Sequence, residues 1–528
     1  MNKTHHSVVK GGLKLGFGQV VAQVCSFIRS IILARLISPA NFGIAATFAM
    51  TFSLLEMLSN LSADKLLIQS KEGNNPELQS TAHLLDVMRG AANAAIIFAL
   101  AIPIARLFGI RQAAWAFECL ALVPLIRGFA HSDFNRLQRE MQFGPSVTMD
   151  ISTNVIATLA AFPLGWWLRD YSAMLWLLIL QAIAYTVGSR VVAERRYSLS
   201  WHPEYIQKMA AFGWPLLING VLMFGIFEGD RLVIGASHRL FLHSIFTLSD
   251  LGVYSVAFSL TMAPTMFVAN VCSSLFLPLL SQVQGSATQF NRRYSACSEM
   301  IALLAAGISI PFIIAGGKCI VLIYGPKYEA AGAVIGWLAA MWALRMIRVT
   351  PTLAAMALGD TTNAMISNAV RSTALVGILC AAALGKHLIW VGICGFLGEF
   401  MATGVSIVRL RARSGVPVLL CVRPLFIAGA AMATAGLTSS FAAKAWIPAI
   451  SSSAVVVGLT GIAMLSVFPR LRQDLQVLVL RSGALASDKL TLRPEPAIQP
   501  LAVPTTPMNS VSVMSGSVIV QTEVPDEP

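Results

Sequence analysis

The sequence predicts an all-α polytopic membrane protein with about fourteen transmembrane helices arranged as two related lobes. Three observations predict this class: the overall composition, the length of the apolar stretches, and an internal repeat. The chain of 528 residues is 56% hydrophobic and 12% charged, with a mean hydropathy of +0.70. An ordinary soluble domain carries about 25% charged residues. A disordered chain and a water-soluble enzyme of several domains are therefore excluded.

The apolar stretches have the length of membrane-spanning helices. A bilayer core about 30 Å thick is crossed by about 20 apolar helical residues. Strands of a membrane barrel would alternate over about ten residues, whereas these stretches are continuous. The expected helices cover residues 13–34, 41–62, 81–104, 113–130, 146–167, 173–192, 210–235, 251–280, 299–323, 331–357, 365–384, 388–408, 424–443 and 446–467.

The distribution of Lys and Arg predicts the orientation in the membrane. The formal charge is +13, and the strongest basic clusters fall in alternate connections, as expected of cytoplasmic loops. Both termini are then cytoplasmic, and the first helix is expected to be retained because no convincing cleavage site follows it. No basic run is interleaved with aromatic residues, so no nucleic-acid partner is expected. These clusters comprise Lys65, Lys71, Arg136, Arg139, Arg195, Arg196, Lys208, Arg292, Arg293, Arg409, Arg411, Arg413 and Arg423.

Neither a metal site nor a cofactor is expected. The eight cysteines form no CxxC pair and lie mostly in apolar stretches, where Cys behaves as a small hydrophobic residue. From about residue 482 the composition turns to Pro, Ser, Thr and Val without helical periodicity. This tail is predicted to be disordered.

Two short motifs recur at nearly the same offset. Gly43 in ANFGI and Gly252 in SDLGV each open an apolar helix, 209 residues apart, and Gly109 and Gly325 each close one, 216 residues apart. A shift of six helices predicts two lobes with the same membrane orientation, as in transporters built from parallel repeats; two unrelated glycine turns are the alternative. The predicted division is 1–195 and 196–410 for the lobes, 411–470 for an extra helix pair, and 471–528 for a cytoplasmic tail.

Arginines inside the spans predict a cavity for an anion. An Arg at mid-helix costs about 2.5–3.5 kcal/mol to insert, so it usually faces water or a partner. Arg345 and Arg348 share one helix face, and the guanidinium fork binds phosphate bidentately without losing its charge. The proposed anion cavity is lined by Arg29, Arg89, Arg345, Arg348 and Arg371.

Acidic residues at the same depth are candidates for ion coupling. They are Glu56, Glu118, Asp150 and Glu399. Some of the buried charges have simpler explanations. Asp86 and Arg89 form an i,i+3 pair, Glu228, Asp230 and Arg231 form a similar local cluster, and Arg371 and Asp150 lie close enough to a membrane surface to reach it by snorkelling.

Five motifs resemble those of the polysaccharide transporter family, the Wzx-type oligosaccharide flippases. They lie at residues 33–43 (LARLISPANFG), 137–143 (LQREMQF), 229–235 (GDRLVIG), 252–254 (GVY) and 324–328 (YGPKY). The resemblance covers residues 10–470 and marks Arg35, Pro39, Gly43, Asp230, Arg231 and Gly252 as motif or gating residues. One departure is a longer, apolar segment 237–249, which is expected to form an interfacial helix.

The resemblance implies the fold of the multidrug/oligosaccharidyl-lipid/polysaccharide (MOP) exporters. It also implies a function, which is to move undecaprenyl-diphosphate-linked oligosaccharide across the bacterial inner membrane for exopolysaccharide, O-antigen or capsule synthesis, driven by an ion gradient. The implied partners are the lipid-linked oligosaccharide, bilayer lipids and the polysaccharide polymerase or chain-length machinery. A lipid II flippase and a multidrug exporter of the same superfamily are alternatives. A membrane polymerase or glycosyltransferase is the alternative from another class, but the sequence offers neither a long loop nor a carboxylate pair for catalysis.

Overall fold

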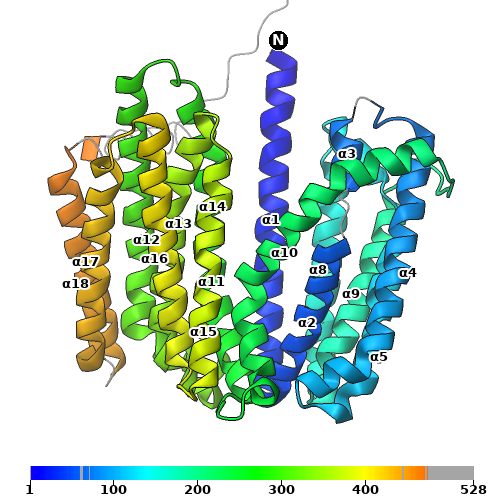
Figure 1. Cartoon of the computed structure of the whole chain (residues 1–528), viewed down its shortest axis with the longest axis horizontal. Coiled ribbons are helices and arrows are strands. Elements are labelled where there is room, and N and C mark those ends of the chain that lie inside the picture. The colour runs from blue at the N-terminus through cyan, green and yellow to red at the C-terminus, as the bar shows by residue number, and fades with distance from the viewer. Residues whose placement is uncertain (1, 60–62, 71, 443–444, 470–471, 474–528) are drawn as a thin grey trace, which may run out of the picture. The chain divides into compact units, whose positions relative to one another are not determined.

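The computed structural model describes residues 2–59, 63–70, 72–442, 445–469 and 472–473. All the regular elements of these residues are helices (Figure 1), which confirms the predicted all-α class. The predicted disordered tail lies outside the described residues. The division into lobes at residues 195 and 410 stays a prediction.

The helices of the first half are α1 (Asn2–Leu36), α2 (Pro39–Ser59), α3 (Ala63–Gln69), α4 (Pro76–Leu107), the 3₁₀ helix η1 (Arg111–Ala113), α5 (Ala114–Leu120), α6 (Leu122–Gly128), α7 (Asp133–Arg139), α8 (Gly144–Leu168) and α9 (Ser172–Val191). Those of the second half are α10 (Pro203–Leu240), α11 (Leu248–Ser281), α12 (Ala287–Tyr324), η2 (Pro326–Ala331), α13 (Gly332–Ala357), α14 (Thr362–Ser372), α15 (Ala374–Ala383), α16 (Ile389–Ser414), α17 (Leu419–Ala442) and α18 (Trp446–Val467).

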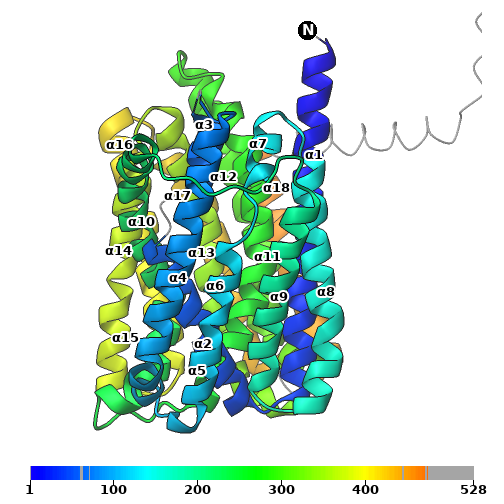
Figure 2. The same ribbon diagram turned by 90° about the vertical axis from the view of Figure 1, so that its right-hand side faces the viewer.

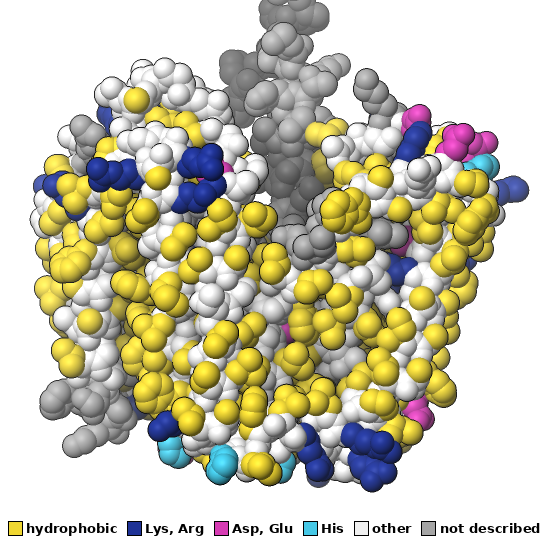
Figure 3. Space-filling model, in the orientation of Figure 1, with side chains coloured by type: hydrophobic (Ala, Val, Ile, Leu, Met, Phe, Trp, Pro, Cys, Tyr) yellow, Lys and Arg dark blue, Asp and Glu magenta, His cyan; other side chains and the backbone are white. Residues whose placement is uncertain are grey.

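Within the described ranges, twelve helices are long and apolar enough to cross a membrane. A thirteenth candidate is the bent pair Arg111–Gly128 and Asp133–Arg139, with 49° between its parts. The predicted span 210–235 falls inside α10, which is not one of these twelve helices. Between the two charged ends of the molecule, the surface shown in Figure 3 is mostly hydrophobic. The structure therefore matches a multi-pass membrane protein.

The spanning helices run between two faces of the bundle. The near face is the face at which α1 begins, and it carries the connections after α2, α6 and α9. The far face is the opposite one, and it carries the connections after α1, α4 and α10 (Figures 1 and 2). The helices form two groups. In the first group, α8 packs against α1 and α9, and α4 packs against α5 and α6. In the second group, α13 is the central helix and packs against α11, α12 and α16, while α17 and α18 cover α12.

The long helix α10 crosses from one group of helices to the other. Its near-face part packs on the first group: Met209 is buried with residues of α3 and α4, and Gly220 lies against the Met57 carbonyl of α2. Its far-face part packs on the second group, where Gly229 lies against Leu375 of α15. One helix therefore links the near face of the first group to the far face of the second (Figure 1).

The two repeat glycines meet where α2 crosses α11. A Cβ atom added to Gly43 would lie 1.9 Å from the Leu248 carbonyl oxygen, and one added to Gly252 would lie 2.0 Å from the Pro39 carbonyl oxygen. Only glycine permits this approach of two backbones. The second pair of repeat glycines, Gly109 and Gly325, both have positive φ angles, of 73° and 103°. They end α4 and α12 in a conformation that favours glycine.

The prediction of an interfacial helix over residues 237–249 is wrong. Helix α10 continues to Leu240, a non-helical connection follows, and α11 begins at Leu248. A capping box at Thr247 and Asp250 starts α11, and a hydrogen bond between the Ser244 and Ser237 hydroxyls, 2.9 Å long, closes the connection. The capping box therefore determines where α11 begins, although the apolar composition of the segment predicted an interfacial helix.

Candidate functional site

Three arginines converge on one buried carboxylate in the second group of helices. Arg345 and Arg348 extend from α13, Arg371 from α14 and Glu399 from α16. The distances from their guanidinium nitrogens to Glu399 oxygens are 3.5 Å for Arg345, 3.1 Å for Arg348 and 3.2 Å for Arg371. The Glu399 side chain is 0% exposed. Arg345 and Arg348 therefore have a carboxylate of another helix as their partner.

A second carboxylate closes the cluster on its α10 side. Asp230 lies 4.0 Å from Arg371 and accepts a 2.7 Å hydrogen bond from the Tyr254 hydroxyl of α11. The proposed snorkelling of Arg371 is wrong, because its side chain is 1% exposed. Nor is Asp230 paired within its own helix, where Arg231 instead pairs with Glu228 at 3.2 Å. The family-motif acid therefore joins α10 to the arginine cluster.

The cluster carries more positive than negative charge. Three guanidinium groups face two carboxylates, and Arg371 Nη1 is buried without a hydrogen-bond partner. Uncompensated buried charge is costly, so an excess cation at this depth favours an anion or water. Arg345 is held over the rings of Phe227 and Trp342, with its guanidinium carbon 4.4 and 5.2 Å from their centroids.

A cavity of about 220 Å³ adjoins the cluster. It lies between α11, α13 and α14, and Arg345 and Arg348 both line it. Arg348 donates hydrogen bonds to the Ser367 hydroxyl and to Asn368, 3.1 and 3.0 Å long, which orient its fork. The other polar lining residues are Thr265, Asn270, Ser273, Thr352 and Asn368. Two guanidinium groups among neutral donors suit the binding of a phosphate group.

The remaining predicted anion-cavity residues lie elsewhere. Arg89 pairs with Asp86 in its own helix at 3.5 Å, as the alternative explanation predicted. Arg29, in α1, is half-buried, and its Nη1 atom has no hydrogen-bond partner. The structure therefore brings together Arg345, Arg348 and Arg371, but not Arg29 or Arg89.

Of the predicted coupling acids, only Glu399 belongs to the arginine cluster. Glu56 of α2 pairs with Arg127 of α6 at 3.4 Å. Asp150 of α8 lines a separate cavity beside Arg127. Glu118 is half-buried in α5. The four acids thus occupy different environments.

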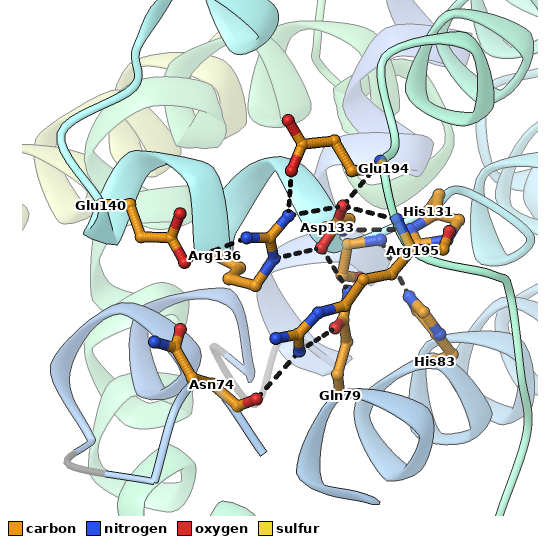
Figure 4. Close-up of polar contacts among 10 residues, drawn as sticks. Asn74, Gln79, His83, His131, Asp133, Arg136, Glu140, Glu194 and Arg195 are labelled. Carbon is orange, nitrogen blue, oxygen red and sulfur yellow. Dashed lines mark hydrogen bonds and ion pairs between the residues drawn. The ribbon is translucent and has the colours of Figure 1, made fainter. Parts of the chain in front are cut away.

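A polar network at the near face holds the connection between α9 and α10 (Figure 4). Asp133 is its centre, fully buried, and accepts from Arg136 Nε at 2.7 Å and from the backbone amides of Glu194 and Arg195 at 2.9 and 3.2 Å. The Arg195 carbonyl lies 3.0 Å from His131 Nε2. The His131 side chain is buried with this connection.

At the far face, two cations bond to helix ends across the two groups. Arg35, at the end of α1, donates to the Ile323 carbonyl of α12 at 2.7 Å and to that of Leu322. Lys327, just after α12, donates to the Arg35 carbonyl at 2.9 Å and to that of Ile37. Each cation satisfies carbonyls that lack a partner within their own helix. With Pro39, Gly43 and Gly252, Arg35 forms the far-face crossing.

Several residues of these sites were not singled out from the sequence. Arg127 lies inside the predicted span 113–130, so its depth was a usable signal. Asp133 stands three residues before Arg136, which is the spacing of a helical ion pair. Ser367 and Asn368 offered no signal, because a polar residue in a span is common, whereas Tyr254 belongs to the GVY motif but was given no role. Among the described residues, no group of His, Cys, Asp or Glu is suited to a metal ion.

The chain matches known proteins in sequence and in fold. Residues 32–333, more than half of the chain, match the family model described as "Polysaccharide biosynthesis protein". Teichuronic acid biosynthesis protein TuaB of Bacillus subtilis (strain 168) is 20% identical over 53% of this chain and 57% of its own. Succinoglycan biosynthesis transport protein ExoT of Rhizobium meliloti (strain 1021) is 21% identical over 59% of this chain and 62% of its own. The chain thus covers less than two thirds of these relatives.

A solved structure of similar fold is the lipid II flippase MurJ in an inward closed conformation. It is 12% identical, with a TM-score of 0.60 over 88% of this chain and 100% of its own. At this identity the likeness concerns the fold alone. It confirms the predicted MOP-type arrangement of membrane helices.

Proposed function

The chain belongs to the family described as "Polysaccharide biosynthesis protein", and from that membership we propose that it is a flippase for lipid-linked oligosaccharides. Its substrate is an undecaprenyl-diphosphate-linked repeat unit used for exopolysaccharide, O-antigen or capsule synthesis. The names of TuaB, a teichuronic acid biosynthesis protein, and ExoT, a succinoglycan biosynthesis transport protein, support this class of substrate.

One observation carries the proposal: three guanidinium groups share the Glu399 carboxylate beside a cavity at membrane depth. A lipid diphosphate is a compact anion whose oxygens match the guanidinium fork. Arg345 and Arg348 bind the diphosphate from the cavity, and Arg371 holds Glu399 and Asp230 in place behind them.

Alternating access follows from the contacts between the two groups of helices. The far face is closed by the Gly43–Gly252 crossing and by the bonds of Arg35 and Lys327. Rocking of the two groups about α10 breaks these contacts and opens the far face. The positions of the basic loops support a cytoplasmic near face, with both termini in the cytoplasm of a bacterium and the chain in the inner membrane.

Ion coupling is assigned to Glu399. Among the four predicted acids it alone touches the arginines that receive the diphosphate. An incoming diphosphate competes with Glu399 for Arg345 and Arg348, and a carboxylate that loses two of its three cationic partners in a low-dielectric site takes up a proton more readily. Proton release then accompanies the return of Glu399 to the arginines.

The proposal is tested by reconstitution of the full chain in liposomes containing a fluorescent polyprenyl-diphosphate oligosaccharide. Wild type is expected to move the lipid between leaflets, while Arg348→Gln and Arg345→Gln lower the rate at least tenfold. Arg169→Gln is the matched control, since Arg169 bonds only to Trp166 of its own helix among the described contacts. An unchanged rate in the Arg348 and Arg345 variants would contradict the proposal.

A further inference from the structure

A second polar cavity lies inside the first group of helices. It measures about 180 Å³ and is enclosed by α2, α6, α8 and α9. Its polar wall consists of Arg127, Asp150, Thr153, Asn154, Gln181 and Tyr185, and its apolar wall includes Phe52, Val123 and Leu178. It is separate from the arginine cavity, since the two share no lining residue.

Polar atoms on this wall have no partner in the protein. The Thr153 side chain is 3% exposed, and its hydroxyl is buried without a hydrogen bond. No hydrogen bond to the Gln181 amide or to the Asp150 carboxylate occurs within the described residues, where the Asn154 side-chain amide donates only to the Asp150 backbone carbonyl. Leaving a buried hydroxyl such as that of Thr153 unpaired costs about 1–3 kcal/mol. These residues are therefore arranged for a ligand or for water that a ligand replaces.

The charges around the cavity do not favour an anion. Arg127 is paired with Glu56 at 3.4 Å and is held over the rings of Phe52 and Tyr185, 5.5 and 5.0 Å from their centroids. With Asp150 ionised the set of three charges is net negative, and with Asp150 protonated it is neutral. Neither state attracts a diphosphate, and the guanidinium on the wall opposes a bare cation. A neutral ligand suits a site that holds a guanidinium group and carboxylates together.

The chemistry of the wall suits a sugar ring. A hexose presents hydroxyl groups at its edge, which both donate and accept hydrogen bonds, and C–H groups on its faces. Asp150 and the Asn154 carbonyl oxygen accept, Gln181 and Thr153 do both, and Phe52 and Tyr185 supply aromatic surface. A site built to bond hydroxyls discriminates strongly against a ligand that lacks them.

We propose that this cavity is a glycan subsite, which binds one sugar residue of the substrate while the arginine cavity holds the diphosphate. The inference rests on the proposed function, because it names a second contact for the same lipid-linked oligosaccharide. Asp150 is then a sugar-binding residue and not an ion-coupling one. A substrate held by both groups of helices links their movement, as a two-site ligand does.

The test compares two probes bound to the purified full chain: polyprenyl diphosphate, and polyprenyl diphosphate carrying one N-acetylhexosamine. Wild type is expected to bind the sugar-bearing lipid about tenfold more tightly, the effect of one or two hydrogen bonds. Asp150→Asn and Gln181→Leu are expected to reduce this advantage to twofold or less and to leave the affinity for the sugar-free lipid unchanged. Ser152→Ala is the matched control, since Ser152 bonds to its own helix at Met149 and does not line the cavity.

The outcomes separate this inference from the proposed function. If the cavity variants keep the full sugar advantage, or weaken both lipids equally, the glycan subsite is refuted while the diphosphate site stands. If Arg348→Gln binds the sugar-free lipid as wild type does, the proposed function fails instead. Thermal stabilisation by sodium over choline that disappears in Asp150→Asn would assign the cavity to a cation and also overturn the inference.

Discussion

Gly43 and Gly252 lie directly against each other where α2 crosses α11. A Cβ atom on Gly43 would lie 3.2 Å from the Gly252 nitrogen, and one on Gly252 would lie 3.0 Å from the Gly43 nitrogen. The two positions are equivalent in the sequence repeat, and each contacts the start of the other's helix. The repeat therefore predicted two glycines of similar role, and the structure makes them a single contact between the two groups of helices.

We expect Gly43→Ala and Gly252→Ala to prevent closure of the far face. The new methyl group would lie 1.9 Å from a backbone carbonyl oxygen in Gly43→Ala and 2.0 Å from one in Gly252→Ala. Only a separation of α2 and α11 relieves these steric clashes. Hydrogen exchange should rise in residues 36–45 and 247–256, and lipid transport should fall at least tenfold. Gly436→Ala is the control, because no atom lies within 4 Å of its added Cβ. Unchanged exchange in both variants would contradict the role of this crossing.

We expect Arg35→Gln and Lys327→Gln to weaken far-face closure in a reciprocal way. A cation at a helix C-terminus contributes about 0.3–1 kcal/mol, so each variant should raise hydrogen exchange at the end of the opposite helix about two- to fivefold. Arg35→Gln should act on residues 321–325, and Lys327→Gln on residues 34–38. If each variant affects only its own helix, the cross-group contact has no energetic role.

We expect Glu399→Gln to destabilise the protein by about 3–5 kcal/mol, since it leaves three buried guanidinium groups without their shared carboxylate. The melting temperature should fall, and added polyprenyl diphosphate should restore it by more than it stabilises wild type, because the lipid supplies the missing anion. Glu329→Gln at an exposed position is the control. A melting temperature equal to that of wild type would show that Glu399 does not balance the arginines.

We expect Asp133→Ala to release the connection between α9 and α10. The change removes the acceptor of Arg136 and of the Glu194 and Arg195 amides, and breaking a buried ion pair costs about 3–5 kcal/mol. Trypsin should then cut at Arg195 or Arg196 much faster than in wild type. Glu140→Ala removes a more exposed partner of Arg136, worth about 0–1 kcal/mol, and should leave the cleavage rate nearly unchanged. Equal rates in the two variants would contradict a central role for Asp133.

Much of the candidate site was visible in the sequence as individual residues, but not as a group. Arg345 and Arg348 were singled out because they share a helix face without a nearby acid. Their relation to Arg371 and Glu399 was not visible, since these residues lie on α14 and α16 and only packing brings them to α13. Arg29 carried the same sequence signal as these two and lies outside the cluster, as does Arg89, which has Asp86 nearby in the sequence.

The sequence by itself determined that the chain is helical, crosses a membrane many times and repeats its motifs. These properties follow from hydropathy and periodicity, which act locally: an apolar stretch of about 20 residues satisfies its backbone only as a helix in lipid. Tertiary structure alone decided which charges share a partner, that the two repeat glycines touch, and that α10 joins one group of helices to the other. Those outcomes depend on how helices far apart in the chain pack. A charged side chain at membrane depth pairs with whichever opposite charge the packing brings close to it, and that residue can lie anywhere in the sequence.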